Sequence, residues 1–486
     1  MAYLLEDFAP QRVLRHFEDI CAIPHGSGNE LALGEHILAL ASHQKLETQR
    51  DSAGNILVRV PASPGYEKVP SLLLQGHLDM VCTQEKGMNK DFLHEPIQLV
   101  LDGHILRANG SSLGADNAVG LCNMMALMEA DDLRHPPLEL LFTTREEVGL
   151  EGIRQFDMTQ LRSRRMLNMD MGDPDCMVIG SAGCGKFALE KYCEMTAADG
   201  QAITVGISGL QGGHSGLMAG KNHASALELA GRVLSALTNE MPARLASLQT
   251  VGTGASIPTD VTLTLHVPCE TTARALLEQL AEQLYAELTE EPECCISVKQ
   301  AHVDAAASVA DTRALADLLL LIPYGVSRRS TEHPEWVLCS SLLVQASYDA
   351  GFFTGLFCLR ANRDTDLARY QLWLHTICRM TETSCRMLGD WIPAWPEQDN
   401  SPLQQLCRSV YYGCFHEELA VEVEHGTVEV SVIAQAIPDM DIVGLAPKSR
   451  GAHTSEEHLY LDTMEPFWLF LTTLVEKMCQ KQSYVL

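Results

Sequence analysis

In the first third of the chain, short apolar runs alternate with longer segments that repeat apolar residues at helical spacing. Short runs bounded by turn residues predict buried strands, and a repeat of about 3.6 residues predicts helices. Strands that alternate with helices are typical of a largely parallel sheet covered on both faces. The expected strands are 56–60, 71–75, 138–143 and 166–169, and the clearest expected helix is 118–130.

The pattern changes near residue 187. Alternating polar and apolar residues at 202–208 and at 261–267 predict two half-buried strands. Each is followed by an amphipathic segment, at 223–237 and at 272–288, that predicts a helix. Two strand–helix repeats of this kind favour a second, smaller α+β domain.

A segment rich in Pro and Trp, 391–401, predicts a connection after this second pattern. The tail then returns to α/β character, so we expect the second domain to be inserted into the first. The expected first domain is 1–187 together with 388–486, and the expected insertion is 188–387. The expected helices of the tail are 402–415 and 463–477, and its expected strands are 419–424 and 440–445.

The composition limits the class of protein. The chain has 486 residues, which is too long for one compact core and agrees with two domains. Its formal net charge of −28 disfavours nucleic acid and anionic membranes as partners, because both attract basic surfaces. No apolar run reaches transmembrane length, and the N-terminal residues lack a secretory signal. The 16 cysteines, many of them in apolar contexts, predict buried free thiols in a reducing compartment, so we expect a cytoplasmic protein.

Two adjacent carboxylates, Glu146 and Glu147, follow directly after the expected strand 138–143. Open α/β sheets keep their sites at this end of their strands. Neighbouring carboxylates repel each other unless a cation neutralises one of them. A metal ion would let one carboxylate act as a ligand and leave the other free to move protons. The ordinary alternative is a solvated first helical turn.

His77 and Asp79 follow another expected strand in the same way. Residues two apart leave a strand on the same side, and a carboxylate often holds the second nitrogen of a metal-binding imidazole. The pair therefore favours His77 as a ligand and Asp79 as its orienting partner. A histidine that lines a turn beside an acid is the ordinary alternative.

Three further motifs add candidate ligands. Asp116 ends a glycine-rich loop, Asp170 ends the expected strand 166–169, and His453 follows a late loop. Taken alone, Asp116 would be interpreted as a helix N-cap. Together the motifs supply two histidines and several carboxylates, which suit Zn²⁺, with Mn²⁺ or Co²⁺ as substitutes. The number of carboxylates favours a two-metal site with one bridging carboxylate.

The residues of these motifs and their order along the chain resemble those of the co-catalytic zinc peptidases that include carnosinases and carboxypeptidase G. Within that family the chain is most similar to the aminoacyl-histidine (Xaa-His) dipeptidases, over nearly its whole length. The resemblance implies an α/β catalytic domain, with a central mostly parallel sheet flanked by helices, and an inserted α+β lid domain. The motifs that carry it are His77-Leu78-Asp79, Leu113-Gly114-Ala115-Asp116-Asn117, Glu146-Glu147, Asn168-Met169-Asp170 and Gly451-Ala452-His453.

The resemblance implies metal-dependent hydrolysis of unblocked dipeptides, with two Zn²⁺ per subunit that Co²⁺ or Mn²⁺ can replace. Glu146 matches the general base of the family, and Asp79 matches the residue that orients His77. Five residues match its metal ligands: Asp116 as the bridge, His77 and Asp170 on one zinc, and Glu147 and His453 on the other.

The resemblance also implies functions for the inserted domain and for some of its residues. The lid of the family closes over a small peptide substrate and often dimerises, which implies a homodimer through the lid. His214, in Gly212-Gly213-His214-Ser215-Gly216, matches a histidine that helps polarise the scissile carbonyl, from the same or the other subunit. Arg360 matches the arginine that holds the substrate carboxylate, and His425 matches a further substrate contact.

Some positions depart from the family pattern. Relatives usually have Asn-Ala-Ile-Pro where this chain has Ala255-Ser256-Ile257-Pro258, and Ser-Leu-Asn where it has Ser341-Leu342-Leu343. Near the C-terminus, Gly-Leu-Glu-Cys-Gly appears as Thr427-Val428-Glu429-Val430-Ser431. The expected ligands all remain. We therefore expect metal binding and hydrolysis to persist, with substrate recognition altered by the loss of amides at Ala255 and Leu343.

Three functions stay open at this point. The first is a dinuclear zinc dipeptidase, and the second is a deacylase or other amidohydrolase of the same architecture. The third is a homologue that binds peptides with little turnover, which the presence of Glu146 disfavours because binding alone needs no general base. Outside the motifs, we expect His135 at the surface and His375 in a core.

Overall fold

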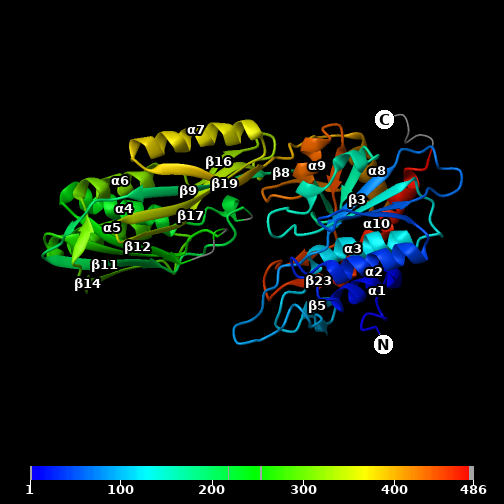
Figure 1. Ribbon diagram of the computed structural model, residues 1–486, viewed down its shortest axis with the longest axis horizontal. Coiled ribbons are helices and arrows are strands. Elements are labelled where there is room, and N and C mark those ends of the chain that lie inside the picture. Colours follow the sequence, from blue (N-terminus) through cyan, green and yellow to red (C-terminus); the bar gives the residue numbers. More distant parts are fainter. Residues whose placement is uncertain (1–2, 217, 252–253, 255, 481–486) are drawn as a thin grey trace. The chain divides into compact units, whose positions relative to one another are not determined.

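The computed structural model describes residues 3–216, 218–251, 254 and 256–480. Its internal contacts divide the chain into two compact units, which are coloured along the sequence in Figure 1. Unit 1 comprises Met1–Gly180, Glu397–Val423 and Val428–Leu486. Unit 2 comprises Ser181–Pro396 and Glu424–Thr427.

Unit 1 contains an eight-stranded mixed sheet in the order β1-β2-β6-β3-β7-β21-β8-β20. Its centre is parallel, since β3 pairs in parallel with β6 and β7, and β7 with β21, whereas β1, β2 and β8 pair antiparallel. Every residue of β3 and β6 is buried, which explains why their sequences are continuous apolar runs. The bounds are β1 Glu47–Arg50, β2 Ile56–Val60, β3 Leu72–His77, β6 Leu138–Thr143, β7 Arg165–Asn168, β8 Cys176–Ser181, β20 Ala420–Glu424 and β21 Asp441–Gly444.

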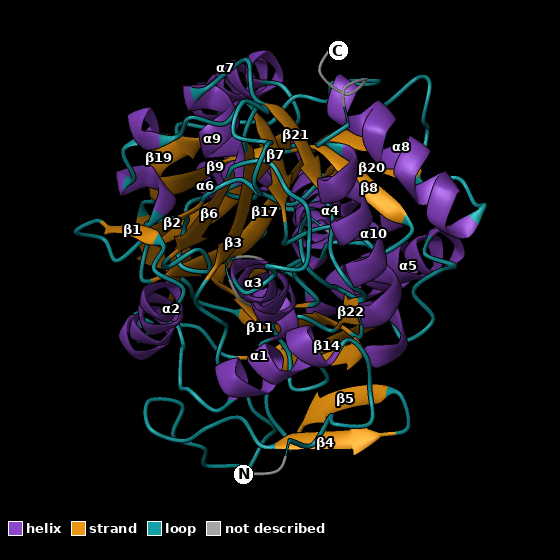
Figure 2. Cartoon of the chain, turned by 90° about the vertical axis from the view of Figure 1, so that its right-hand side faces the viewer, coloured by secondary structure: helices purple, strands orange, loops and turns teal. Residues whose placement is uncertain are grey.

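Helix α3 packs against β3 and against α1 and α2, as Figure 2 shows, while α8 packs against α10 and β21. Two glycines permit the close approach of α3 to the strand ends. A Cβ atom at Gly76 would lie 2.3 Å from Asn117 Oδ1, and one at Gly120 would lie 2.4 Å from the Met169 carbonyl oxygen. The helices are α1 Gln11–Cys21, α2 Leu31–His43, α3 Ala115–Met128, α8 Pro402–Phe415, α9 Val430–Ala436 and α10 Met464–Lys477.

Short elements complete unit 1. A four-stranded sheet has the order β22-β23-β5-β4. Its strands are β4 Leu99–Asp102, β5 Ile105–Ala108, β22 Ser449–Arg450 and β23 His458–Tyr460, and the 3₁₀ helices are η1 Ile153–Gln155, η2 Met158–Gln160 and η4 Leu461–Thr463.

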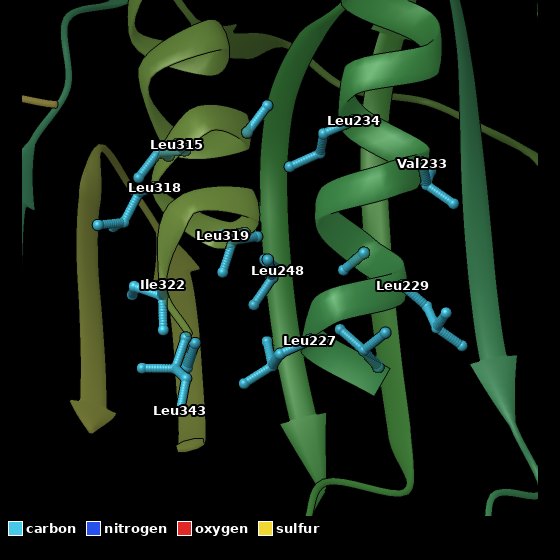
Figure 3. Close-up of a cluster of buried hydrophobic side chains, with 14 of the residues drawn as sticks. Leu227, Leu229, Val233, Leu234, Leu248, Leu315, Leu318, Leu319, Ile322 and Leu343 are labelled. Atoms are coloured by element: carbon cyan, nitrogen blue, oxygen red, sulfur yellow. The ribbon is translucent and has the colours of Figure 1, made fainter. Parts of the chain in front are cut away.

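Unit 2 is an antiparallel nine-stranded sheet with helices on one face (Figure 1). The order is β14-β11-β13-β12-β17-β18-β9-β19, and β16 also pairs with β17. Alternate residues of β13, from Val261 to Val267, are buried beneath the helices, in agreement with the period of a strand. Figure 3 shows the core of this layer, where Leu227, Leu234, Leu315 and Leu319 of the helices meet Leu248 and Leu343 of the strands.

The larger elements of unit 2 follow. The strands are β9 Gly183–Tyr192, β11 Gln201–Ser208, β12 Arg244–Val251, β13 Asp260–Val267, β14 Cys295–Ala301, β16 Gly325–Arg329, β17 Val337–Asp349, β18 Phe352–Ala361 and β19 Ser384–Ile392. The helices are α4 Ala226–Glu240, α5 Glu270–Glu287, α6 Val309–Leu321 and α7 Asp364–Met380. A small pair joins β10 Met195–Ala197 to β15 Ala305–Ala307, and the 3₁₀ helix η3 is Ala219–Lys221.

Two predictions about histidines are wrong. His135 is buried and its Nδ1 lies 2.9 Å from the Pro136 carbonyl oxygen, so a local backbone contact satisfies it away from solvent. His375 is exposed, because the buried stripe of α7 runs through Leu367, Tyr370, Leu374 and Ile377 and leaves position 375 beside it. The apolar residues beside His375 in the sequence do not show which side of α7 packs against the sheet.

All 16 cysteines are free thiols in the structure, and nine of them are buried, among them Cys122, Cys339 and Cys358. The reducing compartment stays a prediction. Within the described residues, no helix is both long enough and apolar enough to span a membrane.

Candidate active site

The predicted metal ligands of unit 1 lie at one edge of its central sheet. His77 is the last residue of β3, Glu146 and Glu147 follow β6, and Asp170 follows β7. The parallel pairing of these three strands brings their carboxyl ends together. Asp116 lies at the start of α3, where its backbone (φ −82°, ψ 102°) is not helical. The loop after β22 adds His453.

His77 is 1% exposed and its two ring nitrogens face different partners. Nδ1 lies 2.9 Å from the backbone carbonyl oxygen of Asp79. Nε2 lies 3.0 Å from Asp116 Oδ1 and 3.4 Å from Asp170 Oδ1. Burial alone lowers the pKa of His77, but the carboxylates of Asp170 and Asp116 outweigh it and raise that pKa well above its ordinary value. Nε2 is therefore aimed at two anionic oxygens.

The Asp116 carboxylate lies between the two histidines. Its Oδ2 is 3.2 Å from His453 Nε2, on the side opposite the Oδ1 contact with His77. The same His453 nitrogen lies 2.8 Å from Glu147 Oε1. Hydrogen bonds with Asp116 and Glu147 raise the pKa of His453 to about 11. Asp116 thus has the position that a carboxylate bridging two cations requires.

Acidic side chains crowd this edge of the sheet. Burial, followed by the charges of neighbouring carboxylates, raises the pKa values of Glu146, Glu147 and Asp170 above their ordinary values. Three groups place one ligand atom from each member within 4.8 Å of the others: His77/Asp116/Asp170, His77/Glu146/Glu147 and Asp116/Glu147/His453. Histidine nitrogens and carboxylate oxygens in such groups fit Zn²⁺ and related divalent ions, whose charge would offset the repulsion.

Asp79 connects two of the motifs. Its carboxylate is 3.5 Å from His77 Nδ1, which is long for a hydrogen bond, so the main contact to the imidazole comes from its backbone carbonyl. The carboxylate instead accepts the backbone N–H groups of Glu146 (2.9 Å) and Glu147 (3.2 Å) and the hydroxyl of Ser27 (2.8 Å). Asp79 therefore holds the Glu146-Glu147 segment as well as His77.

The sequence analysis did not identify Glu457. Its buried carboxylate accepts the backbone N–H groups of Leu113, Gly114 and Asp116, at 2.8, 2.8 and 3.1 Å. These bonds hold the backbone of the loop that leads into α3, while the Asp116 side chain faces the two histidines. Burial raises the pKa of Glu457 to about 7. An acid four residues after His453 was the only signal, and it does not specify this contact.

The predicted substrate contacts all belong to unit 2, and they lie near one another. A Cβ atom at Gly216 would be 3.1 Å from both Arg360 Nε and the His425 carbonyl oxygen, so the loop that carries His214 packs against both residues. Arg360 is largely buried and donates to Thr427 Oγ1 at 3.0 Å. His425 Nε2 lies 2.7 Å from Ser340 Oγ. Burial and the Arg360 charge lower the pKa of His425 to about 3.

The structure does not favour a direct substrate contact at position 343, and the expected effect on recognition stays a prediction. Its side chain is fully buried beneath the helices, where Figure 3 shows it near Ile322. Leu342 and Val344 belong to a separate buried cluster with Cys184 and Cys358. An asparagine at 343 would therefore enter the helix-covered core. The other departure, Ala255, lies outside the described residues.

Comparison with known proteins places the chain among metallopeptidases. The family model for "Peptidase family M20/M25/M40" matches residues 73–477. The chain is 28% identical to the cytosol non-specific dipeptidase of Escherichia coli (strain K12), over 98% of this chain and 99% of that protein. It is similar to the crystal structure of aminoacylhistidine dipeptidase from Vibrio alginolyticus, with a TM-score of 0.86, 27% identity and coverage of 97% and 98%. Human carnosine dipeptidase 1 shares the fold at a TM-score of 0.54 and 13% identity, over 96% of this chain and 97% of that one. The family resemblance and the fold class predicted from the sequence are confirmed.

Proposed function

The chain belongs to peptidase family M20/M25/M40, and from this premise we propose that it is a dinuclear metal-dependent dipeptidase. We propose that it hydrolyses the peptide bond of unblocked dipeptides, including Xaa-His dipeptides such as carnosine. The support from the comparisons is full-length similarity to a non-specific dipeptidase and to an aminoacylhistidine dipeptidase. A cytoplasmic location forms part of the proposal.

The position of Asp116 carries this proposal. Its two oxygens face His77 and His453 at 3.0 and 3.2 Å, and each histidine has a second carboxylate beside it, Asp170 or Glu147. These five residues would hold two Zn²⁺ per subunit, and Co²⁺ or Mn²⁺ would fit the same donors. When bound, such ions supply a Lewis acid that polarises a carbonyl and acidifies water.

Glu146 is the proposed general base. Its carboxylate is next to Glu147 in sequence, and Asp79 fixes its backbone N–H. One oxygen of Glu146 would take a proton from the attacking water and then give it to the nitrogen of the leaving amine. Asp79 would keep both His77 and the Glu146-Glu147 segment in position during this transfer.

Unit 2 is the proposed lid and dimerisation domain. The Arg360 guanidinium would bind the carboxylate of the peptide, because a planar cation with several N–H donors suits a carboxylate. His425 would contact the substrate as a neutral imidazole. His214 would donate a hydrogen bond to the carbonyl oxygen of the scissile bond, from its own subunit or from a partner in a homodimer.

The test is hydrolysis of a dipeptide panel by metal-stripped protein resupplied with Zn²⁺, Mn²⁺ or Co²⁺. The panel includes carnosine, Ala-His and a non-histidine dipeptide, each also in an N-acetylated form. Metal-dependent cleavage of the unblocked members is the expected result. Faster cleavage of the acetylated members would contradict the proposal and favour a deacylase, and metal binding without any cleavage would favour a peptide-binding role.

A further inference from the structure

Four buried polar side chains form a network at or near the carboxyl ends of the central strands of unit 1. They are Gln75 of β3, Thr143 of β6, Asn168 of β7 and Glu429 just before α9. Each is at most 2% exposed, so water does not solvate them from the surface. Buried polar groups of this kind are normally paired, and a network of them fixes its members firmly when most of the bonds are made.

A series of hydrogen bonds connects Glu429 to Asp170, one of the proposed metal ligands. Gln75 Nε2 and Thr143 Oγ1 both donate to Glu429 Oε2. Asn168 Nδ2 donates to Gln75 Oε1 at 2.7 Å, and the backbone N–H of Asp170 donates to Asn168 Oδ1 at 3.0 Å. An unbroken chain of hydrogen bonds therefore leads from the Glu429 carboxylate to the residue that faces His77 Nε2.

The second oxygen of Glu429 makes this carboxylate costly to bury. Glu429 Oε1 is buried and has no hydrogen-bond partner among the described residues. An unsatisfied buried group of this kind costs about 1–3 kcal/mol. Burial also raises the pKa of Glu429 to about 8. An apolar residue would avoid these costs, but it would leave the donors of Gln75 and Thr143 without an acceptor.

We propose that Glu429 is a positioning residue for one half of the metal centre, the half formed by His77, Asp116 and Asp170. By holding Gln75 near the end of β3 and the side chains that end β6 and β7, it fixes the distance between His77 and Asp170. The other half, formed by Asp116, Glu147 and His453, has no member in this chain of hydrogen bonds. The inference rests on the proposed function for the identity of the ligands.

The test is a Co²⁺ titration of metal-stripped full-length protein, followed by visible absorption. Two Co²⁺ ions are expected to bind to the unchanged protein. In Glu429→Ala one of the two affinities is expected to fall about 10- to 100-fold, which is the usual effect of removing a residue that orients a ligand, and the other is expected to remain. Glu429→Gln keeps an oxygen acceptor for Gln75 and Thr143, so it is expected to restore the lost site.

The control is Glu139→Ala. Glu139 is an equally buried carboxylate near the opposite end of β6, and it accepts Ser163 N (2.9 Å) and Ser163 Oγ (2.7 Å). This variant is expected to lose stability but to keep both Co²⁺ sites. If Glu429→Ala does not fold, Asn168→Leu breaks the last bond of the chain, and the same loss of one site is expected.

Each other outcome is informative. Two unchanged Co²⁺ affinities in a folded Glu429→Ala or Asn168→Leu protein would overturn the inference. Equal weakening of both sites would overturn its restriction to one half. A Glu429→Gln protein as impaired as Glu429→Ala would overturn the proposed role of Glu429 as a hydrogen-bond acceptor for Gln75 and Thr143. Failure of the unchanged protein to bind Co²⁺ would instead contradict the proposed function.

Discussion

The candidate-site histidines of the two units lie in opposite electrostatic environments. In unit 1, His77 and His453 each face two carboxylates within 3.4 Å, and the pKa of His453 is raised to about 11. In unit 2, His425 is buried beside the Arg360 guanidinium with Ser340 as its hydrogen-bond partner, and its pKa is lowered to about 3. The same side chain is therefore surrounded by negative charge in one unit and by positive charge in the other.

The difference shows what each cluster can bind. The cluster of unit 1 has an excess of negative charge over its two histidines, so it is suited to divalent cations. The cluster of unit 2 combines a cation, a neutral imidazole and hydroxyl groups, so it is suited to a carboxylate or a carbonyl oxygen. The division agrees with the proposal that unit 1 holds metal ions and that unit 2 holds the carboxylate terminus of the peptide.

The largest expected effect is that of Glu146→Gln in unit 1. Removal of a general base is expected to lower kcat by about 10²- to 10⁴-fold, while Co²⁺ binding stays unchanged. Steady-state kinetics and metal titration of the same preparation measure both quantities. Glu151→Gln, which changes a partly exposed acid on the same segment, is the control. Loss of metal together with activity would mean that Glu146 is a ligand.

Leu343→Asn tests which face of the unit 2 sheet is packed against the helices. The buried amide is expected to destabilise the protein by about 3 kcal/mol, because apolar contacts are lost and a polar group is left without partners. Urea denaturation measures the change. Leu342→Asn is the control, since Leu342 lines a cavity of about 290 Å³ in which an amide can be hydrated. A smaller loss for position 343 than for 342 would refute this assignment of faces.

Arg360→Gln tests the positive character of the unit 2 cluster. A charged hydrogen bond to substrate contributes about 1.5–3 kcal/mol, so KM for dipeptides is expected to rise about 10- to 100-fold. The matched comparison uses dipeptide amides, which lack the C-terminal carboxylate. Their KM is expected to be similar for both proteins. An equal rise for the amides would mean that Arg360 supports the fold and does not bind the carboxylate.

The smallest expected effect is that of His425→Gln on the free energy of unfolding, and it depends on pH. The pKa of His425 is about 3 in the folded protein, against an ordinary 6.5. Below pH 6.5 the unfolded chain takes up a proton that the folded protein does not, so this group lowers stability as the pH falls. Between pH 7 and pH 5 the original protein should lose about 2 kcal/mol more than the variant. Urea denaturation at both pH values measures it, and parallel losses would contradict the lowered pKa.

Much of the unit 1 site could be predicted because its residues lie where strands end. His77, Glu146 and Asp170 each follow an apolar run, and parallel neighbours place such positions at one edge of the sheet. Glu457 and Glu429 could not be predicted in the same way. Their partners are more than 280 residues away in the sequence, and no local pattern connects them.

Prediction was weaker where a strand has two buried faces. Leu342, Leu343 and Val344 are adjacent apolar residues and all three are buried, so the sequence gives no sign of which side chain faces the helices. A register irregularity between Leu343 and Gln345 in the pairing of β17 with β18 further interrupts the alternation. The expectation for Leu343 could not take this into account, since a family motif shows which residue is replaced but not where its side chain points.

The sequence by itself determined the family, the α/β and α+β patterns of the two regions, and the set of side chains able to bind metal. These follow from local periodicity and from motifs only a few residues long. Only the tertiary structure decided which carboxylate lies between the two histidines, which charges surround each histidine, and to which motifs the buried acids Glu457 and Glu429 are hydrogen-bonded. The physical reason is that charge and hydrogen-bond environments are set by residues far apart in the chain, which folding alone brings within 3 to 4 Å of each other.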